Sequence, residues 1–300
     1  MVFRGGNMNR RLRNVKRLLR LLVLAVLIFT LCGCEILLTS SGQTTHKDYD
    51  LQVIMLDVGQ GDSILLASGG EYMLVDAGEN DKGDLVVSDL QRLGVTKLKA
   101  IVGTHPHSDH IGGLDTVIAS IPPEAVYMPR RTADTETYED VLNAVDAAGL
   151  TVTMPKPGDS IKFGEADITF LWPPAKYKSD NDNNHSIVMM VSAGGYRVLL
   201  CGDMEKTVEK ELLDQGLDLD CDVLKVAHHG SDTSSTKAFL KAATPQIALI
   251  SVGQGNSYKH PDKDILKRLE SFGAKIHRTD KEGTVTVTIS GGVMSVTGSE

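Results

Sequence analysis

The run T-H-P-H-S-D-H-I-G-G holds three histidines and one aspartate within six residues: His105, His107, Asp109 and His110. Histidine makes up only 9 of the 300 residues, so packing alone is a poor explanation for this cluster. Neutral imidazole and carboxylate groups are ligands that zinc, manganese and iron accept in proteins. The run therefore predicts a metal site. The alternative is a surface loop that happens to be rich in histidine.

More residues of this kind lie where predicted strands end. Asp76 ends one strand, and the histidine run follows another at 98–104. Asp203 ends a third strand, and His228 and His229 end a fourth. Loops at the carboxyl ends of strands are where α/β folds usually carry their sites. We therefore expect these loops to converge on one place.

The elements that must position these residues are strand-like runs mixed with helical ones, in two successive halves of the chain. Such a pattern predicts two packed sheets with helices on the outside. Strands are predicted at 51–57, 63–67, 72–77, 98–104, 167–172, 186–192, 196–203, 222–230 and 246–253 and as a pair within 283–297, and helices at 84–93, from about 114, and at 204–214, 234–242 and 262–271.

The first 33 residues are predicted to be a signal peptide. A basic start precedes an apolar stretch at 21–34, which is too short to span a bilayer comfortably. The stretch ends in L-C-G-C, which resembles a bacterial lipobox and implies cleavage before Cys34 and a lipid on its sulfur. An uncleaved N-terminal anchor is the alternative. Residues 34–49 then form the lipidated cysteine and a flexible tether, and 50–298 form one domain outside the cytoplasm, anchored to the membrane.

The charge balance bears on the partners. The chain has 31 basic and 39 acidic residues, a net charge of −8. Seven basic residues and no acidic one lie in 1–33, so the remainder holds 24 basic and 39 acidic residues, a net charge of −15. A domain this acidic repels polyanions at long range, which disfavours a non-specific nucleic-acid binder.

Beyond the lipobox the chain has two cysteines, Cys201 and Cys221. Each lies in or beside an apolar, strand-like run, so buried free thiols are expected. A disulfide between them is the alternative in an oxidising compartment.

Further motifs identify a family resemblance. H-P-H-S-D-H resembles the H-x-H-x-D-H signature of the metallo-β-lactamase superfamily, and Gly-Asp at 202–203 resembles its bridging-aspartate motif. More narrowly, the chain resembles the extracytoplasmic hydrolase domain of ComEC/Rec2-type competence proteins and their free-standing homologues over about 51–290. The resemblance implies an αββα sandwich that holds two metal ions in a cleft. The motifs are D-V-G-Q-G-D-S (57–63), V-D-A-G (75–78), N-N-H-S-I-V (183–188), L-K-V-A-H-H-G-S (224–231) and Y-K-H-P (258–261).

The resemblance also allots the ligands of two divalent ions, zinc or manganese. His105 and His107 suit the first ion, Asp109 and His110 suit the second, and Asp203 matches the carboxylate that bridges both. One imidazole of the His228–His229 pair should complete the second site. Neighbours in extended backbone point apart, so we expect His228 as the ligand and His229 facing the substrate.

The first site has a gap. Superfamily members mostly supply a third histidine between the H-x-H-x-D-H run and the bridging aspartate, and here that interval contains only His185. The position is filled by His185 or by Asp182, Asn184 or water.

Several other residues have predicted supporting or catalytic roles. Asp62 and Asp76 would fix ligand imidazoles through their second ring nitrogen, or else be turn aspartates that bind their own backbone. Asp109, if it is not a ligand, would orient the nucleophile, and His229 or His260 would protonate the leaving oxygen. Lys259 stands beside His260 where the family usually has glycine, a departure from the pattern that bears on the shape of this loop.

The leading functional hypothesis is a metal-dependent hydrolase of phosphodiesters, nuclease-like, on the outer face of the membrane. The enzymatic alternatives keep the site and change the substrate to another ester, a lactone, a β-lactam or a cell-wall phosphoester. A surface lipoprotein with a purely structural metal and a diiron redox protein are further alternatives. The first is disfavoured because structural sites are usually closed and mononuclear.

Overall fold

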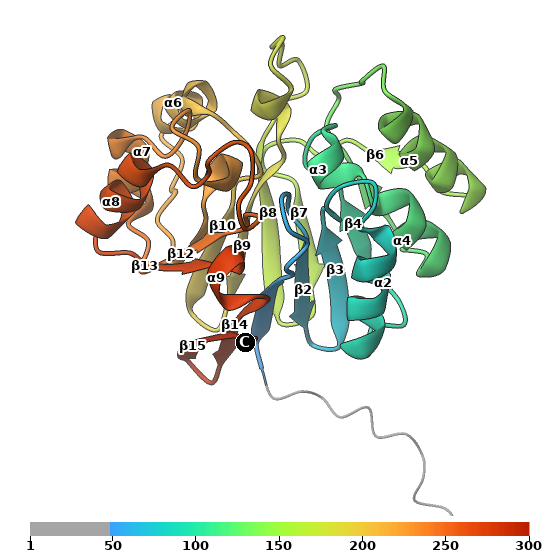
Figure 1. Ribbon diagram of the computed structural model, residues 1–300, viewed down its shortest axis with the longest axis horizontal. Helices are drawn as coiled ribbons and strands as arrows, with labels where there is room; N and C mark the ends of the chain where they lie inside the picture. The colour runs from blue at the N-terminus through green and yellow to red at the C-terminus, as the bar shows by residue number, and fades with distance from the viewer. Residues whose placement is uncertain (1–48, 300) are drawn as a thin grey trace, which may run out of the picture. The chain divides into compact units, whose positions relative to one another are not determined.

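The computed structural model describes residues 49–299, which form a four-layer sandwich with two sheets between layers of helices (Figure 1). The predicted αββα fold is thereby confirmed. The predicted signal peptide at 1–33, the lipidation site at Cys34 and the tether up to residue 48 lie outside the described residues. Across 49–299, none of the helices combines the length and the apolar character that crossing a bilayer requires.

One sheet has eight strands within the described residues. It contains both the first strand of this region and the C-terminal hairpin. The C-terminal hairpin pairs with β1 in antiparallel fashion, with Val287 opposite Val53, whereas β3 to β6 run parallel. Their carboxyl ends therefore lie at one edge. In sheet order the strands are β15 (Val293–Gly298), β14 (Val285–Ser290), β1 (Leu51–Met55), β2 (Ile64–Ser68), β3 (Glu71–Val75), β4 (Ala100–Val102), β5 (Val126–Tyr127) and β6 (Val152–Thr153).

The other sheet has seven strands within 49–299. The strands β10 to β13 are parallel neighbours, while β7 to β10 form an antiparallel meander. In sheet order they are β13 (Lys275–Arg278), β12 (Ile247–Ile250), β11 (Val223–Lys225), β10 (Tyr196–Leu200), β9 (Val188–Ala193), β8 (Ala166–Trp172) and β7 (Ser160–Phe163).

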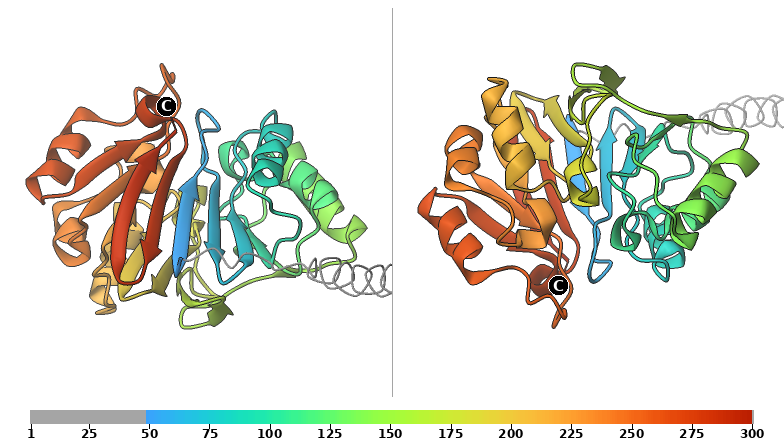
Figure 2. Two further views of the ribbon diagram at one scale, coloured as in Figure 1. Left: turned by 90° about the horizontal axis from the view of Figure 1, so that it is seen from below. Right: turned by 90° about the horizontal axis from the view of Figure 1, so that it is seen from above.

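Helices cover the outer face of each sheet, and Figure 2 shows the two sheets packed face to face between them. The helices α2 (Gly83–Arg92), α4 (Leu114–Ser120) and α5 (Glu136–Ala147) cover the first sheet. The second is covered by α6 (Lys206–Asp214), α7 (Lys237–Ala243) and α8 (Lys263–Ser271). The short elements are α3 (Ser108–Ile111), η1 (Asp182–His185), η2 (Ala227–Gly230) and α9 (Thr279–Glu282).

The alternation of side chains along a strand builds this layering. In β1, Leu51, Val53 and Met55 face the opposite sheet, whereas Ile54 faces the helices. Both faces are apolar because both are buried, and each such side chain contributes about 1.5–3 kcal/mol on burial.

Most predicted elements are present, but some boundaries were wrong. The strand predicted at 222–230 ends at Lys225, because the backbone of the next residues is not extended. The elements β5, β6, α5, β7, β13 and α9 were not predicted. Cys201 and Cys221 are buried free thiols, as predicted.

Candidate metal centre

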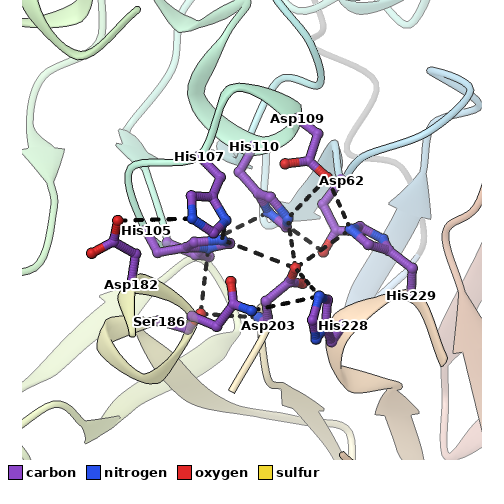
Figure 3. Close-up of polar contacts among 12 residues, drawn as sticks. Asp62, His105, His107, Asp109, His110, Asp182, Ser186, Asp203, His228 and His229 are labelled. Atoms are coloured by element: carbon purple, nitrogen blue, oxygen red, sulfur yellow. Dashed lines mark hydrogen bonds and ion pairs between the residues drawn. The ribbon is translucent and has the colours of Figure 1, made fainter. Parts of the chain in front are cut away.

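The loops that carry the predicted site residues converge at the carboxyl ends of the parallel strands of both sheets. Asp76 follows β3, and the histidine run follows β4 in the first sheet. Asp203 follows β10, and the His228–His229 pair follows β11 in the second. Figure 3 shows the side chains of the histidine run, Asp203, His228 and His229 gathered together. This confirms the predicted convergence of the loops.

The Asp203 carboxylate occupies the centre of this cluster. Asp203 is only 2 % exposed, and its Oδ1 has no hydrogen-bond partner within the described residues. It faces rings from both sheets, which is the position required of a bridging ligand. Its Oδ2 lies 3.3 Å from His110 Nε2, 3.5 Å from His229 Nε2, 3.8 Å from His228 Nε2 and 4.0 Å from His105 Nε2.

Two rings of the histidine run are held by hydroxyl and carboxylate groups behind them. Asp76 Oδ2 lies 2.8 Å from His110 Nδ1 and also accepts a hydrogen bond from Thr104 Oγ1. His105 Nδ1 lies 3.1 Å from Thr104 Oγ1 and 3.3 Å from Ser186 Oγ. Both rings therefore present Nε2 to the cluster, as a ligand imidazole does when its other nitrogen is held. Asp76 has the geometry predicted for it.

Asp62 supports the cluster from a second direction, as part of a buried ion pair. Its Oδ2 lies 2.6 Å from Lys225 Nζ, and both residues are almost completely buried. Its Oδ1 lies 3.4 Å from His229 Nδ1, which also contacts the carbonyl oxygen of Ser251 at 2.9 Å. Lys225 was not predicted as part of the site, although a lysine inside an apolar strand is a signal that it has a buried partner.

The charges of the cluster compensate one another. Burial disfavours ionisation of Asp203, but His110 and His229 outweigh it and hold its pKa well below the usual value. Burial also disfavours ionisation of Asp62, but Lys225 and His229 outweigh this effect and lower its pKa to about 2. Burial disfavours protonation of His229, but Asp203 and the other carboxylates raise its pKa to about 10. Asp203 and Asp62 are therefore ionised at neutral pH, and Asp203, which has no lysine or arginine partner among the ion pairs of the described residues, is suited to bind cations.

The His228–His229 pair lies in left-handed backbone, not in the extended backbone that was predicted. Both residues have φ of +52° within η2. His229 is buried and its Nε2 lies 3.3 Å from Asp109 Oδ2, whereas His228 is partly exposed and its Nδ1 contacts Thr233 Oγ1 at 2.9 Å. The geometry therefore favours His229 as the ligand and His228 as the ring facing substrate, the reverse of our expectation.

The third position of the first site is approached by Asp182 and not by His185. The Nε2 of His185 contacts the carbonyl oxygen of Ser179 at 3.0 Å, and its ring packs against Tyr177. Asp182 Oδ2 lies 3.8 Å from His107 Nε2, and its Oδ1 pairs with Arg131. Of the candidates considered, this geometry favours the carboxylate of Asp182.

The donor atoms fit a pair of metal ions. His110 Nε2 and His229 Nε2 are buried without a hydrogen-bond partner, as is Asp203 Oδ1, and all three belong to this cluster. Buried polar atoms without partners are costly, and a cation at their centre would satisfy them. Within the described residues, ligand atoms lie within 4.8 Å of one another in four overlapping sets of three residues: His105, His110 and Asp203; Asp109, His110 and His229; Asp62, Asp76 and His110; and Asp62, Asp203 and His229.

A cavity of about 180 Å³ opens above these ligands. His260 is half-buried on its wall and its ring packs edge-on against His228, with centroids 5.7 Å apart. Lys259 has φ of +64°, so the loop keeps a left-handed, glycine-like conformation despite the lysine. The wall consists of Gln60, His107, Asp109, Asp203, His228, His229, Tyr258 and His260.

The glycine-rich turn at 57–62 packs directly on the metal-binding loop, which gives a testable prediction. Gly61 has φ of +117°, and a Cβ on it would lie 2.2 Å from the carbonyl oxygen of Asp109. That oxygen also accepts a hydrogen bond from the Asp62 amide at 3.0 Å. We expect Gly61→Ala to displace Asp109, to lower the content of bound metal and to lower the free energy of unfolding by more than ~2 kcal/mol.

Gly59→Ala is the matched control in the same turn. Gly59 has φ of +79°, but a Cβ there would meet no atom within 4 Å. This variant should lose only the roughly 1–2 kcal/mol of left-handed strain and keep its metal. Chemical unfolding and metal analysis measure both effects, and equal losses in the two variants would refute the proposed role of the Gly61–Asp109 contact.

Comparison with known proteins shows the family of this chain. The sequence profile described as Metallo-beta-lactamase superfamily matches residues 56–254. ComE operon protein 3 of Bacillus subtilis is 30 % identical over 78 % of this chain and 32 % of its own length. Competence protein ComA of Neisseria gonorrhoeae is 33 % identical over 78 % of this chain and 31 % of its own length. The chain thus spans about a third of the length of these curated relatives.

Solved structures show the same fold at lower identity. The metallo-beta-lactamase fold protein YhfI of Bacillus subtilis is 16 % identical with a TM-score of 0.50, over 76 % of this chain and 96 % of that one. The diiron beta-hydroxylase CmlA of Streptomyces venezuelae is 13 % identical with a TM-score of 0.54, over 80 % of this chain and 54 % of that one. At these identities the likeness concerns the fold alone.

Proposed function

Because the chain belongs to the metallo-beta-lactamase superfamily and is a metal-dependent hydrolase of that class, we propose that it hydrolyses phosphodiesters. The observation that carries this proposal is that the cavity wall combines candidate metal ligands with hydrogen-bond donors. The carboxylates of Asp109 and Asp203 and the imidazole of His229 lie among the candidate metal ligands, while other polar groups of the wall include imidazoles and an amide that can donate N–H groups and the hydroxyl of Tyr258. Such donors suit the anionic oxygens of a phosphoryl group. These donors include His228, His260 and Gln60.

Two further facts bear on the substrate. Relatives at 33 % and 31 % identity are named a competence protein and a recombination protein, which agrees with a nucleic-acid phosphodiester. The net charge of −15 beyond residue 33 repels long polyanions. We therefore favour short phosphodiesters over duplex nucleic acid.

The residues divide the work of hydrolysis as follows. A pair of divalent cations, zinc in this proposal, would supply Lewis acidity that lowers the pKa of water and offsets phosphoryl charge. Asp203 would hold both cations, and Asp76 and Asp62 hold the rings of His110 and His229. His260 is the cavity-wall imidazole that no carboxylate within the described residues contacts closely. Burial and the nearby rings of His228 and His229 lower its pKa, which disfavours the predicted protonation of the leaving oxygen and leaves His260 to contact the substrate as a neutral imidazole.

A second candidate keeps the site and changes the bond. Hydroxyacylglutathione hydrolase of Tolumonas auensis is 29 % identical over 46 % of this chain and 44 % of its own length. This similarity favours a thioester or another neutral ester as the alternative substrate. Lactones, β-lactams and cell-wall phosphoesters are further alternative substrates of the same site.

The experiment is a comparison of substrates that share one leaving group. The full chain, loaded with zinc or manganese, is given bis-p-nitrophenyl phosphate, p-nitrophenyl phosphate and p-nitrophenyl acetate. We expect fastest enzymatic turnover of the diester, its loss on chelation, its recovery on readdition of metal, and its loss in His107→Ala. Absence of diester cleavage with either metal, or a larger kcat/KM for the acetate, would refute the proposal.

We propose further that the domain is held at the outer face of the membrane by a lipid on Cys34. The support is the basic start, the short apolar core and the L-C-G-C sequence of the N-terminal segment. Labelling of cells with radioactive palmitate should mark the full chain and Cys32→Ser, but not Cys34→Ser. Equal labelling of the two variants would exclude Cys34 as the site.

A further inference from the structure

Tyr258 exposes an aromatic ring at the cavity that holds the metal ligands. It is 65 % exposed and lines the same cavity as Asp109, Asp203 and His229. Single exposed apolar side chains are common on protein surfaces, so exposure alone does not indicate a binding site. The position matters here, because the other large apolar side chains that are strongly exposed within 49–299 do not line this cavity. These are Leu85, Leu142, Met154 and Val293.

The ring of Tyr258 is held in place from behind. It stacks on the ring of His260, with centroids 5.8 Å apart and planes 15° from parallel. The loop between them is fixed by Asn256, whose Nδ2 donates to the carbonyl oxygens of Gly253 at 2.9 Å and His260 at 2.7 Å. Its Oδ1 accepts a hydrogen bond from the His260 amide at 3.0 Å. A ring ordered before binding loses little further entropy when a ligand covers it.

The loop is also tied to the glycine-rich turn on the opposite wall. The Gly253 amide donates to Gln60 Oε1 at 3.3 Å, and Ser251 Oγ donates to the Gly61 carbonyl at 2.6 Å. Gln60 itself lines the cavity. The distance between the aromatic ring and the metal ligands is therefore set by fixed contacts within the described residues.

We propose that Tyr258, backed by His260, is a stacking platform for the nucleobase next to the scissile phosphate. A flat aromatic face recognises planar π systems without regard to sequence. A nucleotide is the chemical class that carries such a ring within a few bonds of a phosphoryl group. Lys259, the next residue in the chain, is exposed and carries a positive charge in an otherwise acidic domain. This inference rests on the proposed function and narrows its substrate to nucleoside phosphodiesters.

The test compares two phosphates that differ by the base. Adenosine 5′-monophosphate and ribose 5-phosphate are titrated by calorimetry into the zinc-loaded full chain. We expect the nucleotide to bind about tenfold more tightly, a difference of about 1.4 kcal/mol. The advantage should persist in Tyr258→Phe, which keeps the ring, and fall below about threefold in Tyr258→Ala. Val293→Ala, which truncates an equally exposed side chain away from the cavity, should behave as wild type.

Each other outcome decides against the platform. Equal affinities in the wild type, no measurable nucleotide binding, or an advantage that survives Tyr258→Ala would overturn it. The titration needs no turnover, so it separates this inference from the proposed function. If the chain prefers the nucleotide but cleaves no diester, the stacking platform stands and the proposed activity is refuted. If the chain cleaves bis-p-nitrophenyl phosphate but shows no preference for the base, the activity stands and the stacking platform is refuted.

Discussion

Asp203→Asn should leave the fold intact, abolish stable binding of both metal ions and lower hydrolysis by about 10³-fold. The reason is the central position of this carboxylate. Its Oδ2 lies 3.3 Å from His110 Nε2 and 4.0 Å from His105 Nε2, so it faces both groups of ligand rings. Asparagine keeps the volume but has one oxygen and no charge, so it cannot bridge two cations.

Metal analysis after dialysis and the rate on bis-p-nitrophenyl phosphate measure this effect. Asp222→Asn is the matched control, because Asp222 lies at the opposite end of β11 from the site. Its carboxylate accepts hydrogen bonds from the Arg197 amide at 2.9 Å and Gln246 Nε2 at 2.8 Å. The control should keep its metal and its rate. Two tightly bound ions in Asp203→Asn would contradict the bridging role.

The fold was largely predictable because its central strands are apolar and its turns are rich in glycine. β1, β2 and β3 and the end of α2 before Gly94 follow directly from that pattern. β5 and β6 have two residues each, which is too short for any periodicity to register. α5 buries Tyr138, Val141 and Val145 on one side, so a helical signal was present but sparse.

The site was predictable in its location and not in its details. Topology brings the ends of parallel strands together, so Asp76, Asp203 and the histidine run had to meet. Asp62 and Lys225 are 163 positions apart in the chain, and no local sequence pattern predicts that they pair. The choice between His228 and His229 depends on a φ of +52° at both, and non-glycine residues rarely adopt such an angle.

The difference between these two histidines is the second large effect that we expect. His229→Ala should remove one of the two metal ions and lower hydrolysis by about 10²- to 10³-fold, because its buried Nε2 faces Asp109 and Asp203. His228→Ala should keep both ions and lose about 10- to 100-fold in rate. Its ring is 22 % exposed and its Nδ1 already contacts Thr233, so it is placed to contact substrate.

The two variants control for each other. Alanine at either position must adopt the same left-handed backbone, so the strain of roughly 1–2 kcal/mol is common to both. Any difference in metal content therefore reports the side chains. Metal-to-protein ratios near one for His229→Ala and near two for His228→Ala are the expected result. The opposite pair of ratios would restore His228 as the ligand and place His229 against the substrate, as extended backbone at this point would have required.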